Sequence, residues 1–203
     1  MDHRQYRGKW VFHPKPPPGS AALAALTTAV GVPLPDAVID FLNATHGGGL
    51  EYAIPIPDFE EYGPMVFSEL STVTDILDHH RWMMRFWETP QTLLPFARDG
   101  IGSVVCVDLS MADCAPIVAY VKPYPIWKDG EPDGMGRGGW TVVAPSMDDY
   151  LDRLFVDLDT EKEVLEDLIA DQDLDGFQRA SARLDRLAPG WRAKMPLTLP
   201  EGW

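Results

Sequence analysis

The sequence predicts an α+β domain: a pair of helices, then an antiparallel sheet closed by a further helix, with a helical extension after it. Three observations favour this class. Helical apolar patterns occupy both ends of the chain, and strand-like runs gather between residues 103 and 144. The two strongest runs are separated by only six residues, a length that suits neighbouring antiparallel strands. An apolar fraction of 45% over 203 residues is enough for a sizeable core.

The N-terminal part begins with a polar, proline-rich arm over residues 1–18, which two helices follow. The first helix spans residues 20–30 and ends at Gly31. The second begins at Pro35, which suits a first helical turn, and ends at three glycines, residues 47–49. Its inward side chains recur at helical spacing: Val38, Phe41, Leu42 and Thr45. His46 is expected to cap the end of this helix.

The strands are expected in the middle of the chain. Residues 50–56 alternate weakly, and residues 103–109 and 116–122 are predicted to be neighbouring strands. Residues 140–144 form another strand. Between them, residues 123–139 contain five glycines and three prolines and are predicted to be a long irregular loop.

The remaining helices are marked by their starts. Three serine or threonine residues are followed three positions later by an acidic residue, the pattern of a capping box: Thr72–Asp75, Ser146–Asp149 and Thr160–Glu163. A last helix is expected over residues 177–187. The run of residues 82–87 is rich in bulky apolar side chains, and Trp82, Phe86 and Trp87 are predicted to pack in a core.

The charge is strongly and unevenly acidic. The net charge of −14 argues against nucleic acid as a ligand, because phosphates need a basic surface. Acidity aids solubility, and it also attracts basic protein partners. Residues 148–175 hold twelve carboxylates and two cations, whereas residues 177–194 are basic. Two helices of opposite sign can therefore pair with each other, or the acidic one can face a partner.

Metal and cofactor sites are not expected. His79 and His80 are adjacent and point in different directions on a helix, so they cannot easily share one ion. Residues 171–176 fit the first half of a calcium loop, but Ala182 stands where the bidentate Glu is needed. The preferred interpretation is that Asp173 or Asp175 caps the next helix. The sequence also lacks the nucleophile-elbow, P-loop and zinc-protease motifs.

Cys106 and Cys114 are too few for a disulfide framework and are expected to be buried thiols in a reducing compartment. No apolar run is long enough to span a membrane, and the first residues lack the apolar core of a signal peptide. These features predict a cytoplasmic protein without a membrane partner.

Three segments together resemble the SUKH superfamily. The first is Leu34-Pro35, Phe41-Leu42 and His46-Gly47-Gly48, similar to the family's Leu-Pro, Phe-Leu and Asn-Gly-Gly, with His46 at the usual Asn. The second covers residues 94–109, similar to a Pro-Phe-Ala, Gly-x-Gly, strand and Asp-Leu block. The third covers residues 143–151, similar to the start of the family's closing helix.

The resemblance implies a SUKH-like domain over residues 19–157, with a helical extension over residues 158–203. It implies a protein-binding module that is not an enzyme. Bacterial members are typically immunity proteins that bind and neutralise a toxin, so a cognate toxin encoded by an adjacent gene is the expected partner. A basic toxin surface, such as that of a nuclease, would suit the charge. Fungal relatives resemble regulators of cell-wall synthesis, so a regulatory or scaffold protein is the alternative. A homodimer is left open.

The candidate partner-binding residues come from composition and loop length. Tyr124 and Trp127 lie between charged, glycine and proline residues and are interpreted as interface anchors, or alternatively as side chains packed on the sheet. Acidic residues would form the rim of this surface: Glu60, Glu61, Asp129, Glu131 and Asp133.

Overall fold

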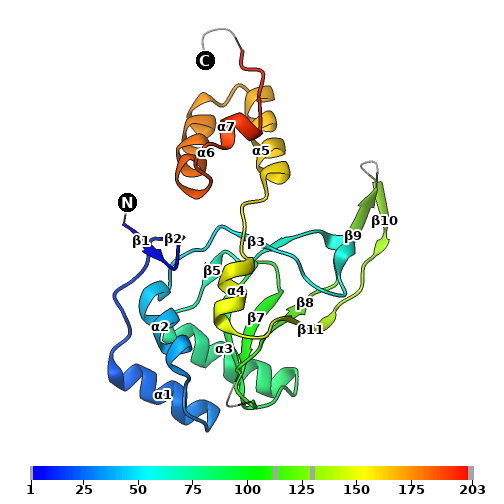
Figure 1. Ribbon diagram of the computed structural model, residues 1–203. Helices are drawn as coiled ribbons and strands as arrows, with labels where there is room; N and C mark the ends of the chain where they lie inside the picture. Colours follow the sequence, from blue (N-terminus) through cyan, green and yellow to red (C-terminus); the bar gives the residue numbers. More distant parts are fainter. Residues whose placement is uncertain (1, 112–113, 129–130, 201–203) are drawn as a thin grey trace. The chain divides into compact units, whose positions relative to one another are not determined.

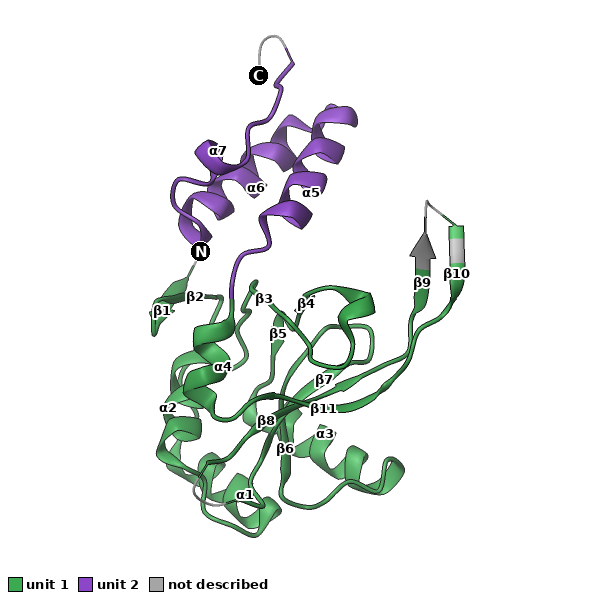
Figure 2. Cartoon of the chain, turned by 45° about the vertical axis from the view of Figure 1, so that its right-hand side comes forward, with its two compact units in different colours: residues 1–154 green, residues 155–203 purple. Residues whose placement is uncertain are grey.

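A computed structural model of the chain describes residues 2–111, 114–128 and 131–200. The chain divides into two compact units, residues 1–154 and 155–203 (Figures 1 and 2). Unit 1 combines helices with antiparallel strands, which confirms the predicted α+β class. Its helices are α1 (Ser20–Val30), α2 (Asp36–Thr45), α3 (Val73–Phe86) and α4 (Met147–Arg153).

The centre of unit 1 is a five-stranded sheet in the order β11-β8-β7-β6-β5, with every neighbouring pair antiparallel. Its strands are β5 (Glu69–Leu70), β6 (Leu93–Arg98), β7 (Val104–Asp108), β8 (Ile117–Val121) and β11 (Gly139–Ala144). The strands expected over residues 103–109, 116–122 and 140–144 are confirmed. The weaker prediction over residues 50–56 holds only for β3 (Ala53–Ile54), which pairs with β4 (Met65–Val66).

The two faces of the sheet are covered differently. On one face Phe96 of β6 makes edge-to-face ring contacts with Phe41 of α2, at 5.2 Å, and with Tyr150 of α4, at 5.5 Å. All three side chains are buried, so α2 and α4 build the main core on this side. On the opposite face Met83 of α3 packs with buried side chains of β6 and β7. Helix α3 packs chiefly on β6, which leaves β8 and β11 less covered on this face.

Two segments predicted to lack strands form hairpins. Within the first 18 residues, β1 (His3–Tyr6) pairs with β2 (Lys9–Phe12), and the tight turn uses positive φ at Arg7 and Gly8. Backbone hydrogen bonds between Phe12 and Gly49, at 2.9 and 2.8 Å, join this hairpin to unit 1. The predicted polar arm is therefore an integral part of that unit.

The prediction of an irregular loop over residues 123–139 is wrong. Strands β9 (Pro125–Lys128) and β10 (Glu131–Met135) pair antiparallel, and the hairpin projects from the sheet (Figures 1 and 2). The glycines serve its geometry: Gly134 has a φ of 111° at an irregularity between Pro132 and Met135.

His46 ends α2 as expected and also joins three segments. Its Nδ1 lies 2.7 Å from the carbonyl oxygen of Pro16, which can only accept, so Nδ1 carries the proton. Its Nε2 accepts the N–H of Val73 at 3.1 Å, in the first turn of α3. The neutral ring thus satisfies a helix N–H that has no partner within α3.

Helix starts follow the predicted caps in two of three cases. Thr72 and Asp75 form the predicted capping box, and Ser146 caps α4. The predicted start at Thr160 is wrong: Asp157 caps the helix instead, accepting from backbone N–H groups of its first turn. Asp157, three residues before Thr160, therefore satisfies the free N–H groups at the start of α5.

The two cysteines differ in burial. Burial is confirmed for Cys106, but Cys114 is exposed and its predicted burial is wrong.

Unit 2 is a small helical unit. It consists of α5 (Leu158–Ala170), α6 (Leu174–Leu187) and α7 (Trp191–Lys194), packed around Leu165, Leu184, Trp191 and Met195. The acidic α5 and basic α6 are joined by an ion pair between Glu161 and Arg183, which is one of the two alternatives that the charge pattern left open. Asp173 caps α6 by accepting from Gly176 N at 2.8 Å, which confirms the capping interpretation of this acidic segment.

Replacing Thr72 with alanine is expected to lower the free energy of unfolding by about 1 kcal/mol, because it removes the N-cap of α3. Urea unfolding of the full chain measures the change. Thr74→Ala is the matched control, since Thr74 is exposed inside the same helix and its loss removes no cap. Equal effects of the two substitutions would contradict the capping role.

Candidate functional site

Two of the predicted partner-binding residues, Tyr124 and Glu61, lie at the base of the β9–β10 hairpin. The Tyr124 hydroxyl donates to Asp99 Oδ2 at 2.6 Å and lies 2.9 Å from Ser103 Oγ. The Tyr124 N–H donates to the hydroxyl of Tyr62, which in turn donates to the Arg137 carbonyl oxygen at 2.7 Å. Tyr124 is therefore held by internal hydrogen bonds.

Asp99 organises the turn beneath that tyrosine. Its Oδ1 accepts three backbone N–H groups, those of Ile101, Gly102 and Ser103, at 2.8–2.9 Å. Burial raises the pKa of Asp99, but these hydrogen bonds and that of Tyr124 outweigh it and hold the pKa below its usual value. The pKa of Tyr124 is raised to about 12, mainly by burial and secondly by the hydrogen bond to Asp99.

Substituting phenylalanine for Tyr124 is expected to lower the free energy of unfolding by about 1–2 kcal/mol, since Asp99 loses a donor. The pKa of Tyr124 is raised from 10.0, so its stabilisation is complete below pH 10 and is lost as the pH rises toward 12. Denaturation profiles at a series of pH values measure both effects. Tyr120→Phe should retain the wild-type profile, and an unchanged profile for Tyr124→Phe would refute this role.

The predicted acidic partner-binding residues that the structure describes lie in two parts of unit 1: a short 3₁₀ helix and the β9–β10 hairpin. Glu60 and Glu61 lie on a short 3₁₀ helix, Glu60–Tyr62, and both are exposed. Glu61 pairs with Arg137 at 3.2 Å, and the Arg137 hydrogen bond lowers the pKa of this carboxyl. Arg137 lies after β10, so the structure brings Glu61 to the hairpin base.

The other candidates belong to the hairpin itself. Glu131 and Asp133 are exposed on β10, and the backbone of Trp127 lies in β9. Asp129 lies outside the described residues. The role of all seven residues in partner binding stays a prediction.

A second surface, which the sequence did not indicate, is formed by five aromatic side chains on the α3 side of the sheet. We call it the aromatic cluster: Trp82, Phe86, Trp87, Tyr120 and Trp140. Ring centroids of successive members lie 4.5–5.6 Å apart. Trp82 is 42% exposed, Phe86 58% and Trp140 41%. Large aromatic side chains left this open in one contiguous group make this a candidate binding surface.

Helix α3 and strand β11 position these rings. In α3, Met83 faces the sheet, while Trp82 and Phe86 are four residues apart on an adjoining stripe that the sheet does not reach. In β11, Trp140 lies opposite Tyr120 and shares its face. Because α3 covers mainly β6, the rings on β8 and β11 keep one side open.

The prediction that Trp82 and Phe86 pack in a core is therefore wrong. Trp87 is the exception in part, since it is half-buried against the cluster of Met83 and its neighbours. The sequence shows that residues 82–87 are rich in bulky apolar side chains, but it does not show what covers them. The signal that could have indicated the surface is the stripe's offset from Ile76, His80 and Met83, which are buried.

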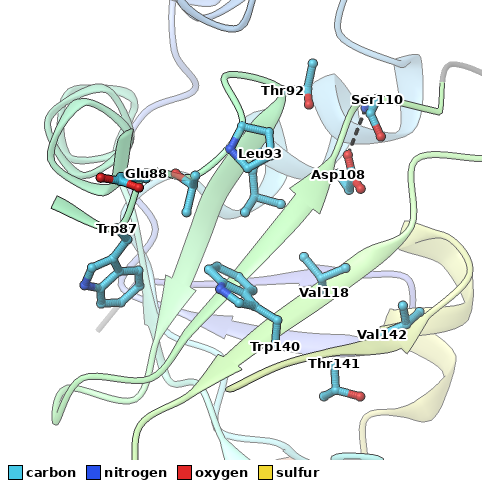
Figure 3. Close-up of a pocket in the computed structure, with 12 residues that line it drawn as sticks. Trp87, Glu88, Thr92, Leu93, Asp108, Ser110, Val118, Trp140, Thr141 and Val142 are labelled. Carbon is cyan, nitrogen blue, oxygen red and sulfur yellow. Dashed lines mark hydrogen bonds between the residues drawn. The ribbon is translucent and has the colours of Figure 1, made fainter. Parts of the chain in front are cut away.

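A cavity of about 390 Å³ adjoins the aromatic cluster (Figure 3). Leu93, Val118 and Val142 supply apolar walls beside Trp87 and Trp140. Figure 3 shows Glu88 near Trp87 on one side and Asp108 with Ser110 on the other, with Trp140 and Leu93 between them. Thr141 belongs to the other face, where its hydroxyl donates to Asp58 Oδ2 at 2.9 Å.

In the described part of the chain, no group of three or more His, Cys, Asp or Glu side chains is placed to hold a metal ion. None of the helices in that part is both long and apolar enough to cross a membrane.

The architecture defines a class of α+β domain: two N-terminal helices, a central antiparallel sheet and a closing helix. The model of the SMI1 / KNR4 family (SUKH-1) matches residues 17–153, which is most of unit 1. The chain therefore belongs to the SUKH-1 family, as the sequence motifs indicated. No curated protein matches the chain.

Proposed function

We propose that this chain is an immunity-type protein that neutralises a bacterial toxin by binding it stoichiometrically, without catalysis. The observation that carries the proposal is the aromatic cluster, in which three large side chains are exposed: Trp82 and Phe86 on α3, and Trp140 on the adjoining strand β11. Partly exposed Trp and Tyr are the side chains that most often anchor protein interfaces.

The charge favours a basic partner. The chain carries a net charge of −14, which speeds encounter with a positively charged surface and disfavours acidic ones. A toxin that acts on nucleic acid needs such a basic surface itself. We therefore infer that a nuclease-type toxin domain is the first candidate partner.

Co-expression tests the proposal. The product of the adjacent gene is produced in bacteria alone and together with this chain, and growth is compared. Restored growth, with a one-to-one complex in co-purification and light scattering, is the expected result. Absence of both rescue and complex would contradict the proposal.

A regulatory or scaffold protein is the second candidate, because the resemblance to the SUKH superfamily also implies fungal relatives that resemble regulators of cell-wall synthesis. Such a protein would use the aromatic cluster for several cellular partners. Genome context distinguishes the two functions, since only the immunity function requires a toxin gene beside this one.

A further inference from the structure

We propose that the cavity beside the aromatic cluster receives one arginine side chain of the partner protein. The inference rests on an aromatic wall, Trp87 and Trp140, in a cavity that two carboxylates flank: Glu88 beside Trp87 on one side and Asp108 on the other. The inference deepens the proposed function and rests on it for the protein that carries the arginine.

The cavity has the dimensions of a ligand site. Its volume of about 390 Å³ falls in the usual range of about 300–1,000 Å³. Leu93, Val118 and Val142 line it and suit the methylene stem of a long side chain. A charged head can then lie against the rings while the stem stays on the apolar wall.

The aromatic wall is held in place by its neighbours. The Trp140 ring lies 5.3 Å from Tyr120 and 6.2 Å from Trp87, nearly perpendicular to the latter. Trp87 contacts Tyr120 at 4.5 Å. Tryptophan is the aromatic side chain that attracts cations most strongly, and a planar guanidinium also stacks on its face.

The charges around the cavity are of one sign. Asp108 Oδ1 accepts the N–H of Ser110 at 2.9 Å, which fixes the carboxylate at one side. Glu88, just after α3, is exposed near the other side. Among the described residues that line the cavity there is no Lys, Arg or His, and neither carboxylate is in an ion pair within the described part of the chain.

An occupant that is apolar only would leave these carboxylates uncompensated, whereas an arginine pairs with them and stacks on the rings. Lysine offers a point charge without the planar group that matches both carboxylate and indole. The negative field of the whole chain further favours a cation. Charge complementarity therefore selects arginine over an aliphatic anchor.

The test uses the full-length chain and needs no toxin. N-acetyl-L-arginine amide is titrated into the ¹⁵N-labelled chain, and the indole signals are followed by NMR after assignment with Trp→Phe variants. The matched neutral probe is N-acetyl-L-citrulline amide, which has nearly the same shape without the charge. We expect saturable shifts at Trp87 and Trp140, with arginine bound at least about tenfold more tightly than citrulline.

Variants separate charge from shape. Glu88→Gln with Asp108→Asn should reduce arginine binding to the level of citrulline, because Asn retains the acceptor for Ser110 N–H. Glu163→Gln, an exposed carboxylate in unit 2, should leave the affinity unchanged. Equal binding of arginine and citrulline, equal binding of N-acetyl-L-lysine amide, or no shift at either indole would overturn the inference.

The two proposals fail separately. Toxin rescue without arginine binding refutes the arginine site alone, whereas arginine binding without any toxin complex refutes the immunity function alone. Light scattering at the NMR concentration tests whether a second copy of this chain fills the cavity instead. A dimer that Trp140→Ala converts to a monomer would mean that the second copy covers the cavity, and would overturn the inference.

Discussion

Trp140→Ala is expected to weaken the complex with the protein partner by about 30-fold or more, corresponding to about 2 kcal/mol or more. Trp140, like Trp87, belongs both to the aromatic cluster and to the cavity lining, so its loss removes an anchor and part of a wall. The side chain is 41% exposed in the free chain, and the fold should lose little stability. Isothermal calorimetry on the co-purified partner measures the change.

Variants of the projecting hairpin provide the comparison. Glu131→Ala and Asp133→Ala remove exposed carboxylates of β10, and Met135→Ala removes an exposed apolar side chain of the same strand. We expect each to change affinity only a few-fold, as rim positions do. Full affinity in Trp140→Ala with large losses in the hairpin variants would mean that the partner binds at the hairpin, where the sequence placed it.

Phe96→Ala is expected to lower the free energy of unfolding of unit 1 by about 3–5 kcal/mol, the largest stability effect in this account. Phe96 contacts Phe41 and Tyr150 at once, so truncation opens a cavity between the sheet and two helices. The three side chains are almost fully buried, and their rings cannot all move to fill the space. Urea denaturation followed by circular dichroism measures the loss.

Phe86→Ala is the matched control for that experiment. The same side chain is removed from an exposed position, so stability should change by less than about 0.5 kcal/mol. The same substitution should weaken partner binding, because Phe86 belongs to the aromatic cluster. A comparable loss of stability in both variants would contradict the assignment of Phe96 to the core and Phe86 to the surface.

Local patterns in the sequence were sufficient for much of unit 1. Thr72 and Ser146 begin helices through interactions within three residues, so their caps follow from spacing alone. The β-branched apolar run of β7 and the alternating burial of β8 both indicate strands whatever lies around them. The sequence did not predict the β9–β10 hairpin, because glycines and prolines are common both in loops and in irregular strands. Only the pairing of β9 with β10 distinguishes the two structures, and local sequence does not show that pairing.

The candidate surface could not be predicted in the same way. Exposure of Trp82 depends on how far α3 extends over the sheet, and this follows from packing rather than from periodicity. Trp140 and Tyr120 become neighbours only through the register of β11 on β8. Glu88 and Asp108 come from different elements, so their placement around one cavity has no sequence signature.

Hydrogen–deuterium exchange of the free chain and of its complex with the adjacent gene product decides whether the partner covers the aromatic cluster, because it locates the covered surface without any substitution. We expect slower exchange on binding in the peptides that contain residues 82–88, 118–120 and 140–142, with little change in the β9–β10 hairpin. Protection confined to the hairpin, or to unit 2, with the aromatic cluster unchanged would contradict the proposed binding surface.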